Sequence, residues 1–313
     1  MPVRKSKKVM LFDPRAPAKM TKMGNITDLV VCDSFTREPI CVKVSKDSYV
    51  NTRTGEVLDY THITNRSQCF DSIRKTMRKI RELVNTNVTN IYNVRWITLT
   101  YKDNMTDSKR LYHDYEKFWK RFTYYCDKRG YSKPRYITVV EPQGRGAWHI
   151  HGLFIWERKA PFIENSVLKE IWGKGFVSIK QPVNCDNLGA YFSGYLADMP
   201  LEEVEKLPED LQVKAYVAAS TLGSVEPVDV VSQENKPKKI IKGARLAMYP
   251  SGMNIYRHSK GIKKPEVIRT TYRKAREYLA GAKETYYQSY EVLDKNGCRQ
   301  NRILKASYNT KRK

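Results

Sequence analysis

The chain has 313 residues, of which 57 are Lys or Arg and 33 are Asp or Glu, so its formal net charge at pH 7 is +24. This excess of positive charge indicates a polyanionic partner, and the 21 tyrosines favour nucleic acid over a membrane surface because bases stack on aromatic rings. No apolar run approaches the about 18 residues of a membrane span, and no C-x-x-C pair indicates a zinc ribbon. We therefore expect a cytoplasmic nucleic-acid-binding protein whose six cysteines are reduced.

The first 95 residues divide into a basic arm and a mixed segment. Residues 1–24 are basic and contain three prolines, which predicts a loose arm. Residues 25–95 contain β-rich runs and then an apolar stripe at helical spacing up to Val84, which predicts a β-hairpin followed by a helix with one basic face. Asn65 or Ser67 is expected to cap that helix.

Residues 96–220 form the expected core. Their alternation of β-branched runs with helical apolar stripes predicts an α+β fold with a central antiparallel sheet flanked by helices. The expected elements in order are a strand at 95–101, a helix that begins at Thr106 or Asp107, strands at 136–141 and 148–154, a helix at 161–172, a strand at 175–180, and helices at 187–198 and 199–220.

The C-terminal third is basic and less periodic. Residues 221–239 carry Gly, Pro and Ser without periodicity, which predicts a linker or long loop. Residues 240–313 are expected to form a basic extension that packs on the core. Within it, 266–280 reads as a helix, and 284–308 reads as a hairpin that turns at Asn-Gly.

Two of the five histidines, His149 and His151, stand two apart in an apolar run that reads as a strand. Both rings would then point to one face of a sheet. The preceding strand ends at Glu141, and a hairpin symmetric about the connecting loop would pair Val139 with His149 and Glu141 with Ala147. Glu141 would lie diagonal to His149, which predicts a metal site of two histidines and a glutamate. The alternative is a pair of surface histidines on an amphipathic strand.

Tyr191 and Tyr195 are four residues apart in an expected helix and so share one of its faces. A tyrosine hydroxyl, with a pKa near 10, attacks a phosphodiester usefully only where a divalent cation polarises the phosphate. With a His-x-His strand upstream, the pair indicates a nucleophile, whereas without that strand it would indicate aromatic packing onto a sheet.

Three stretches in this order together resemble the HUH endonucleases that initiate rolling-circle replication, and are most similar to the initiators of small plasmids and single-stranded DNA phages. They are Trp96-Ile97-Thr98-Leu99-Thr100, Trp148-His149-Ile150-His151 and Gly189-Ala190-Tyr191-Phe192-Ser193-Gly194-Tyr195. A further stretch from Gly243 to Ser259 resembles a C-terminal part of this group. The resemblance implies an HUH endonuclease fold related to the RNA-recognition fold.

The resemblance also implies a mechanism. Glu141, His149 and His151 would hold Mg²⁺ or Mn²⁺ on the scissile phosphate of single-stranded origin DNA. Tyr191 or Tyr195 would attack it, which leaves a 5′-phosphotyrosyl link and a free 3′-hydroxyl. A host DNA polymerase and a host helicase would then be partners.

The chain departs from the family at one place. The family often has a lysine three residues after the tyrosine, where this chain has Gly194 or Asp198. Which tyrosine acts, and whether a remote Lys or Arg substitutes, therefore stays open, although Tyr191 matches the single nucleophile of simpler members.

Basic residues beside these motifs are candidate contacts to DNA: Arg95, Arg145, Lys174, Lys180, Arg245 and Arg257. Two other readings of the chain are open. A conjugative relaxase or single-strand transposase uses the same chemistry, and a non-catalytic nucleic-acid-binding protein would need only the basic surface. The motifs do not indicate an oligomeric state.

Overall fold

The computed structural model describes residues 3–6, 10–35, 41–60, 70–182, 185–222, 225–231, 237–250, 252–294 and 296–312. The chain divides into two compact units, one made of Met1–His62 with Pro265–Lys313 and the other of Ile63–Lys264. Every described strand pairing is antiparallel, and helices accompany the sheets, which confirms the expected α+β class. None of the described helices is both long and apolar enough to cross a bilayer.

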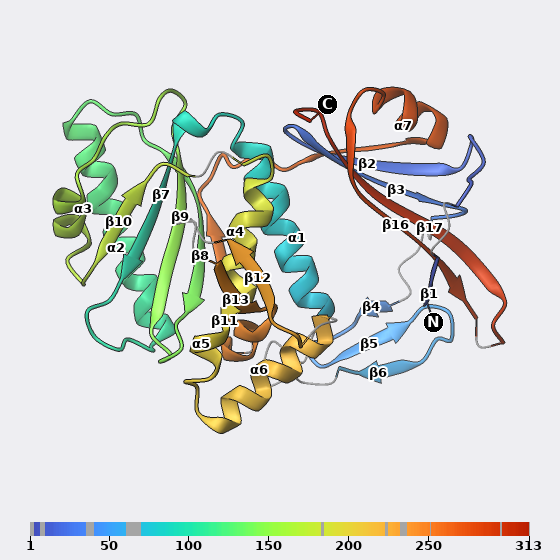
Figure 1. Cartoon of the computed structure of the whole chain (residues 1–313), viewed down its shortest axis with the longest axis horizontal. Helices are drawn as coiled ribbons and strands as arrows, with labels where there is room; N and C mark the ends of the chain where they lie inside the picture. Colours follow the sequence, from blue (N-terminus) through green and yellow to red (C-terminus); the bar gives the residue numbers. More distant parts are fainter. Residues whose placement is uncertain are drawn as a thin grey trace. The chain divides into compact units, whose positions relative to one another are not determined.

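The larger unit is built on a five-stranded sheet in the order β10-β7-β9-β8-β14 (Figure 1). Its strands are β7 (Val94–Thr100), β8 (Arg135–Pro142), β9 (Trp148–Ile155), β10 (Val177–Lys180) and β14 (Tyr256–His258). The first four match the strands expected from the sequence to within two residues at either end.

Helices cover both faces of this sheet (Figure 1). They are α1 (Phe70–Asn87), α2 (Ser108–Lys128), α3 (Asn165–Trp172) and α4 (Leu188–Ala197), with a 3₁₀ turn at Ile91–Asn93 before β7. Asp107 caps α2, as expected, by accepting hydrogen bonds from the amides of Lys109 and Arg110. The proposed caps of α1, Asn65 and Ser67, lie outside the described residues.

Each face of the sheet carries its own hydrophobic cluster. On one face, α2 and α3 bury Phe118, Phe122 and Trp172 against alternate strand residues such as Phe154. On the other face, α1 and α4 bury a second set against the remaining strand residues: Ile80, Leu83, Val84, Trp96, Ile137, Val139, Leu153, Leu188, Phe192 and Leu196. Because strand residues alternate between faces, this second face is also the one that carries Glu141 and both histidines.

A small subdomain completes the larger unit. It contains β11 (Met199–Pro200), α5 (Leu201–Val204), α6 (Glu209–Leu222), β12 (Val228–Val231), β13 (Pro237–Ile241) and a 3₁₀ helix, η3 (Ala244–Met248). The strands β11, β13 and β12 form a three-stranded sheet. The expected linker at 221–239 therefore contains paired strands, because Val228, Val230 and Val231, and Ile240 and Ile241 just after the segment, favour extended backbone.

The smaller unit is a six-stranded sheet in the order β1-β16-β17-β3-β2-β15. Its strands are β1 (Val3–Ser6), β2 (Pro17–Met23), β3 (Ile26–Cys32), β15 (Glu266–Thr271), β16 (Lys283–Leu293) and β17 (Arg299–Asn309). Helix α7 (Tyr272–Tyr278) packs on one face of this sheet (Figure 1). Its Ala275 and the following Leu279 share one hydrophobic cluster with Leu29 and Ala306. A separate hairpin sheet contains β4 (Cys41–Lys43), β5 (Ser48–Asn51) and β6 (Val57–Asp59).

This unit differs from the expected organisation in three places. The basic arm at 1–24 contributes β1 and β2, and in the sequence the lysines of β2, Lys19 and Lys22, obscure its buried positions Ala18, Met20 and Met23. The expected helix at 266–280 begins as β15, since Val267, Ile268 and Thr270 are β-branched, and becomes helical only at Tyr272. The extension at 240–313 divides between the units at Pro265, and only its hairpin at 284–308 forms as expected.

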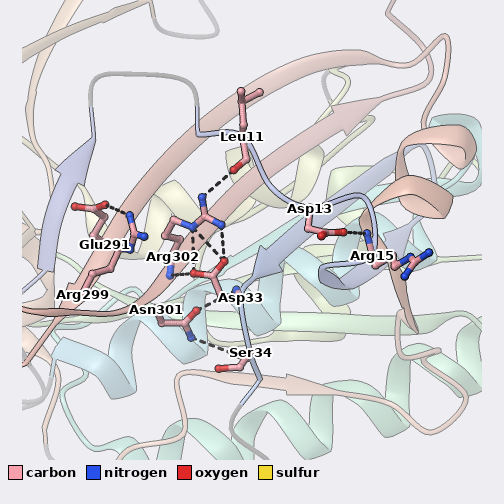
Figure 2. Close-up of polar contacts among 9 residues, drawn as sticks. All are labelled: Leu11, Asp13, Arg15, Asp33, Ser34, Glu291, Arg299, Asn301 and Arg302. Carbon is pink, nitrogen blue, oxygen red and sulfur yellow. Dashed lines mark hydrogen bonds and ion pairs between the residues drawn. The ribbon is translucent and has the colours of Figure 1, made fainter.

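Asp33 and Arg302 join distant segments of the smaller unit (Figure 2). The guanidinium of Arg302 donates to the carboxylate of Asp33, with Nη2 2.8 Å from Oδ1, and its Nη1 donates to the carbonyl of Leu11 at 2.9 Å. The backbone amide of Arg302 also donates to Asp33 at 2.9 Å. The hydrogen bonds from Arg302 hold the pKa of Asp33 below its ordinary value.

Arg302→Met is expected to lower the free energy of unfolding by about 1 kcal/mol at neutral pH, since the pair is partly exposed but charge-assisted. The folded-state pKa of Asp33 lies below its unfolded value, so this stabilisation is present above about pH 4 and is lost as pH falls through the lower, folded-state pKa. Urea denaturation of the full chain at about pH 7 and about pH 3 checks both points. Arg299→Met is the control, because Arg299 makes one 3.4 Å contact with Glu291. Equal losses in both variants would contradict the assignment.

Candidate metal and nucleophile site

The hairpin of β8 and β9 brings Glu141 directly opposite His149, and Val139 opposite His151. The expected register, with Val139 opposite His149, is therefore wrong by two residues. Pro142 pairs in β8 rather than opening the loop, so the turn closes one residue later, where the amide of Gln143 donates to the carbonyl of Ala147 at 2.8 Å. A shift of two residues preserves the alternation of faces, so the carboxylate and both rings still point to one side.

One ligand atom from each of Glu141, His149 and His151 lies within 4.8 Å of the other two. Nε2 of His151 is hydrogen-bonded to Oε2 of Glu141. Nδ1 of the same ring lies 3.1 Å from the hydroxyl of Thr98 on β7, which fixes the orientation of the ring. Nε2 of His149 is buried and has no hydrogen-bond partner among the described residues.

The protonation of this group suits a divalent cation. Burial lowers the pKa of His149 to about 4, and the charges of His151 and Arg145 contribute, so the ring is neutral at pH 7 and its nitrogen is available as a ligand. Burial alone would raise the pKa of Glu141, but the hydrogen bond from His151 and the charge of Arg245 outweigh it and hold that pKa below its ordinary value. The two imidazoles and the carboxylate, with Nε2 of His149 buried and without a partner among the described residues, therefore fit a metal ion.

Arg245 of η3 is the basic residue that contacts this group. Its Nη2 lies 3.1 Å from Oε1 of Glu141 and 3.5 Å from Oε2 of Glu203. Its Nε and Nη1 donate to the carbonyls of Asp198, at 3.0 Å, and Pro142, at 2.7 Å. The side chain is only 4% exposed, so this geometry favours a role in holding Glu141 over the expected direct contact with DNA.

Helix α4 carries both candidate tyrosines. The ring of Tyr191 is partly buried and packs edge-on against Trp96 of β7, with ring centroids 5.8 Å apart. The same indole meets His151 with centroids 6.2 Å apart. Tyr191 therefore lies on the sheet face that carries the metal-ligand group. Tyr195 is in the same helix, but its side chain lies outside the described part of the structure.

Both ends of α4 are anchored. At its start, Asn187 caps the helix through the amide of Ala190, and Asn85 of α1 accepts from the amide of Gly189 at 2.8 Å. At its end, the hydroxyl of Tyr249 lies 3.2 Å from the carbonyl of Leu196 and 2.8 Å from that of Val140 on β8. These contacts fix the position of the tyrosine helix relative to the metal-ligand strands.

Gly189 is required by the close approach of α1 and α4. A Cβ at this position would lie 2.5 Å from the carbonyl oxygen of Arg81 and 2.9 Å from its Cα. Gly189→Ala is therefore expected to push the helices apart and lower the free energy of unfolding by about 1–3 kcal/mol. Thermal and urea denaturation measure the loss.

Gly194 in the same helix provides the matched control. A Cβ there would meet only Asp198 Oδ2, at 3.7 Å. Gly194→Ala should be neutral or stabilising by up to about 1 kcal/mol through helix propensity. Equal destabilisation by both alanines would show that the space between α1 and α4 is not the cause.

The other basic candidates lie at different places. Lys180 of β10 is exposed and its Nζ lies 6.0 Å from the centroid of Trp96, on the same face as the metal-ligand group, and Arg145 is exposed in the β8–β9 turn. Three others lie towards α2 and α3 and already have internal partners. Arg95 donates to the carbonyls of Ala160 and Pro161, Lys174 pairs with buried Asp114, and Arg257 stacks on Tyr112 at 3.7 Å and pairs with Glu116.

The sequence did not predict that Thr98 contacts His151 or that Arg245 contacts Glu141. Thr98 belongs to the first of the three motifs. It is two residues from Trp96 in a strand, so its side chain lies on the same sheet face as Trp96 and His151. The alternation of strand residues could therefore have predicted its contact with His151. The contact between Arg245 and Glu141 joins residues about a hundred positions apart, and no local pattern indicates it.

Residues 94–200 match the family model described as Replication-associated protein ORF2/G2P. The matched segment begins with β7, includes both ligand strands and ends just after the tyrosine helix, and the match confirms the resemblance to phage rolling-circle replication proteins of the HUH type. No curated protein and no solved structure matches the chain.

Proposed function

We propose, from the membership of residues 94–200 in the Replication-associated protein ORF2/G2P family, that the chain initiates rolling-circle replication by nicking single-stranded DNA at an origin. The observation that carries the proposal is the shared sheet face of two groups. Potential ligand atoms of Glu141, His149 and His151 converge on that face. The indole of Trp96 packs against both Tyr191 and His151 there.

The proposed roles follow from the contacts of each side chain. Glu141, His149 and His151 would hold Mg²⁺ or Mn²⁺, and the chemistry supplied by such an ion is polarisation of the scissile phosphate and neutralisation of the charge that develops on it. Thr98 keeps the ring of His151 in position, and Arg245 keeps the carboxylate of Glu141 in position. Arg245 thus supplies a fixed positive charge beside the ligands, and we propose that it substitutes for the family's lysine, which this chain lacks at Gly194 and Asp198.

The proposed covalent step is a transesterification between Tyr191 and the DNA backbone. The hydroxyl oxygen of Tyr191 forms a bond to phosphorus and loses its proton, while the bond from phosphorus to the 3′-oxygen breaks and that oxygen gains a proton. The products are a 5′-phosphotyrosyl link and a free 3′-hydroxyl, which a host polymerase can extend. Tyr195, four residues along the same helix, would serve a second transfer that closes the displaced strand.

The family match favours replication over the two alternatives. A conjugative relaxase or single-strand transposase would use the same chemistry, but the matched model describes replication-associated proteins. A non-catalytic DNA-binding protein would need neither the buried Nε2 of His149, which has no hydrogen-bond partner in the described part of the chain, nor the convergence of three potential ligands.

The test is a nicking assay on labelled single-stranded DNA with Mn²⁺ or Mg²⁺, followed by denaturing electrophoresis and mass mapping of the peptide bound to DNA. We expect a divalent-ion-dependent adduct on a peptide from α4. DNA binding without any cleavage, at every ion and sequence tried, would support the non-catalytic alternative and overturn this proposal.

A further inference from the structure

A cavity of about 630 Å³ lies between the β8–β9 turn and the start of the small subdomain. One wall is the turn from Gln143 to Gly146, and the opposite wall is the connection from α5 to α6. The two walls approach closely, since a Cβ on Gly144 would lie 3.9 Å from both the carbonyl of Glu203 and the side chain of Leu207. The volume is within the range of small-ligand sites, about 300–1,000 Å³.

The lining combines an apolar base with positive charge. Leu211 and Met248 pack on the subdomain core with one side and line the cavity with the other. Arg145 and Lys206 are exposed at the rim, and neither has an ion-pair partner in the part of the chain that the structure describes. The one acidic residue of the lining, Glu203, is already paired with Arg245. The cavity therefore offers an apolar surface to a flat ring and two free positive charges to an anion.

Two links connect the walls of the cavity to Glu141, His149 and His151. Gln143 in its wall follows Glu141 by two residues on the same hairpin. The guanidinium of Arg245 joins the carboxylate of Glu203, in the opposite wall, to the carboxylate of Glu141. Arg145 at the rim is also near enough for its charge to act on His149.

We propose that this cavity binds one nucleotide of single-stranded DNA next to the scissile phosphate. The base lies on Leu211 and Met248, and Arg145 and Lys206 bind the flanking phosphates. This inference rests on the proposed function, because it takes the strand to pass over Glu141 and the two histidines. It assigns to the subdomain outside the nucleophile helix a role in holding the DNA beside the reactive phosphate.

The experiment measures equilibrium binding without cleavage, by fluorescence anisotropy of a labelled oligothymidylate of about 15 residues in EDTA. A second oligomer of equal length carries abasic residues. Lys206→Ala removes a rim charge, Leu211→Ala removes apolar surface from the base of the cavity, and Lys214→Ala is the matched control, since Lys214 is on α6 outside the cavity and pairs with Asp210.

Lys206→Ala is expected to reduce the log–log salt slope of binding by about 0.7, as for one phosphate contact on a single strand, while Lys214→Ala leaves it unchanged. Leu211→Ala should weaken binding of oligothymidylate about fivefold, the effect of losing apolar contact with one base, and should leave binding of the abasic oligomer unchanged. Circular dichroism verifies that this variant is folded, and Lys206→Ala carries the test alone if it is not.

An unchanged salt slope in Lys206→Ala, or equal effects of Leu211→Ala on both oligomers, would overturn the proposed subsite. Neither outcome bears on cleavage, which requires the divalent ion that EDTA removes. A chain that nicks DNA but fails these tests would keep the proposed function and lose the subsite. A chain that passes them without nicking would keep the subsite as a DNA-binding cavity and lose its place beside a reactive phosphate.

Discussion

Tyr191→Phe is expected to abolish the covalent protein–DNA adduct while the fold and the DNA affinity stay as in the wild type. The substitution removes the attacking oxygen but keeps the ring that packs edge-on against Trp96. Loss of a nucleophile should reduce adduct formation by at least about 10³-fold. Denaturing electrophoresis of reactions with Mn²⁺ measures the adduct, and anisotropy in EDTA measures binding.

Tyr195→Phe separates the two tyrosines. If they alternate, this variant should form the first adduct at the wild-type rate but fail to join the displaced strand into a circle. Adduct formation that persists in Tyr191→Phe and disappears in Tyr195→Phe would reverse the assignment. Full cleavage by the double variant would end the assignment of the nucleophile to α4, because no other residue of α4 carries a phenolic oxygen.

The core of the larger unit follows from local pattern. Alternating apolar residues and helical stripes place β7, α2, β8, β9, α3, β10 and α4 in order, because each element carries its own periodicity, even where its partner in the sheet lies far along the chain. The shared face of Glu141, His149 and His151 depends only on strand parity, which a register error of two residues leaves intact. This explains why the ligand set could be derived while the partner of Glu141 in β9 could not.

The smaller unit depends on pairings that span almost the whole chain. β3 pairs with β17, so Leu29 lies beside Ala306, and β2 pairs with β15. Each strand has a local signal, but no local pattern specifies a partner about 280 residues away. The lysines of β2 made the first segment look like an arm, although alternate residues such as Ala18 and Met20 are buried.

The net positive charge indicates a DNA-binding chain, but it does not indicate which basic residues contact DNA. The net charge of +24 fits a DNA-binding chain, yet Arg245 is buried and bound to internal acceptors, and Arg95 donates to backbone carbonyls. Composition cannot distinguish an arginine that meets a phosphate from one that holds a carboxylate, because both roles use the same planar group of donors.

His149→Ala is expected to abolish cleavage and to weaken Mn²⁺ binding by more than the roughly 10- to 100-fold typical of losing an outer-shell partner. The Nε2 of His149 is buried without a hydrogen-bond partner in the described structure, so its removal costs the fold no hydrogen bond and the metal group one ligand. Isothermal titration with Mn²⁺ measures the affinity, and the adduct assay measures cleavage.

Two further variants serve as controls for the effect of His149→Ala on Mn²⁺ binding and cleavage. Thr98→Val removes only the hydroxyl that orients His151, so Mn²⁺ affinity should fall by about 10- to 100-fold and cleavage should persist at saturating ion. His113→Ala changes an exposed histidine of α2 outside the cluster and should leave both measurements unchanged. Mn²⁺ affinity that is equal in His149→Ala and the wild type would show that the three side chains do not act as a metal site. Loss of cleavage in that variant would then require a role of His149 in contacting the DNA itself.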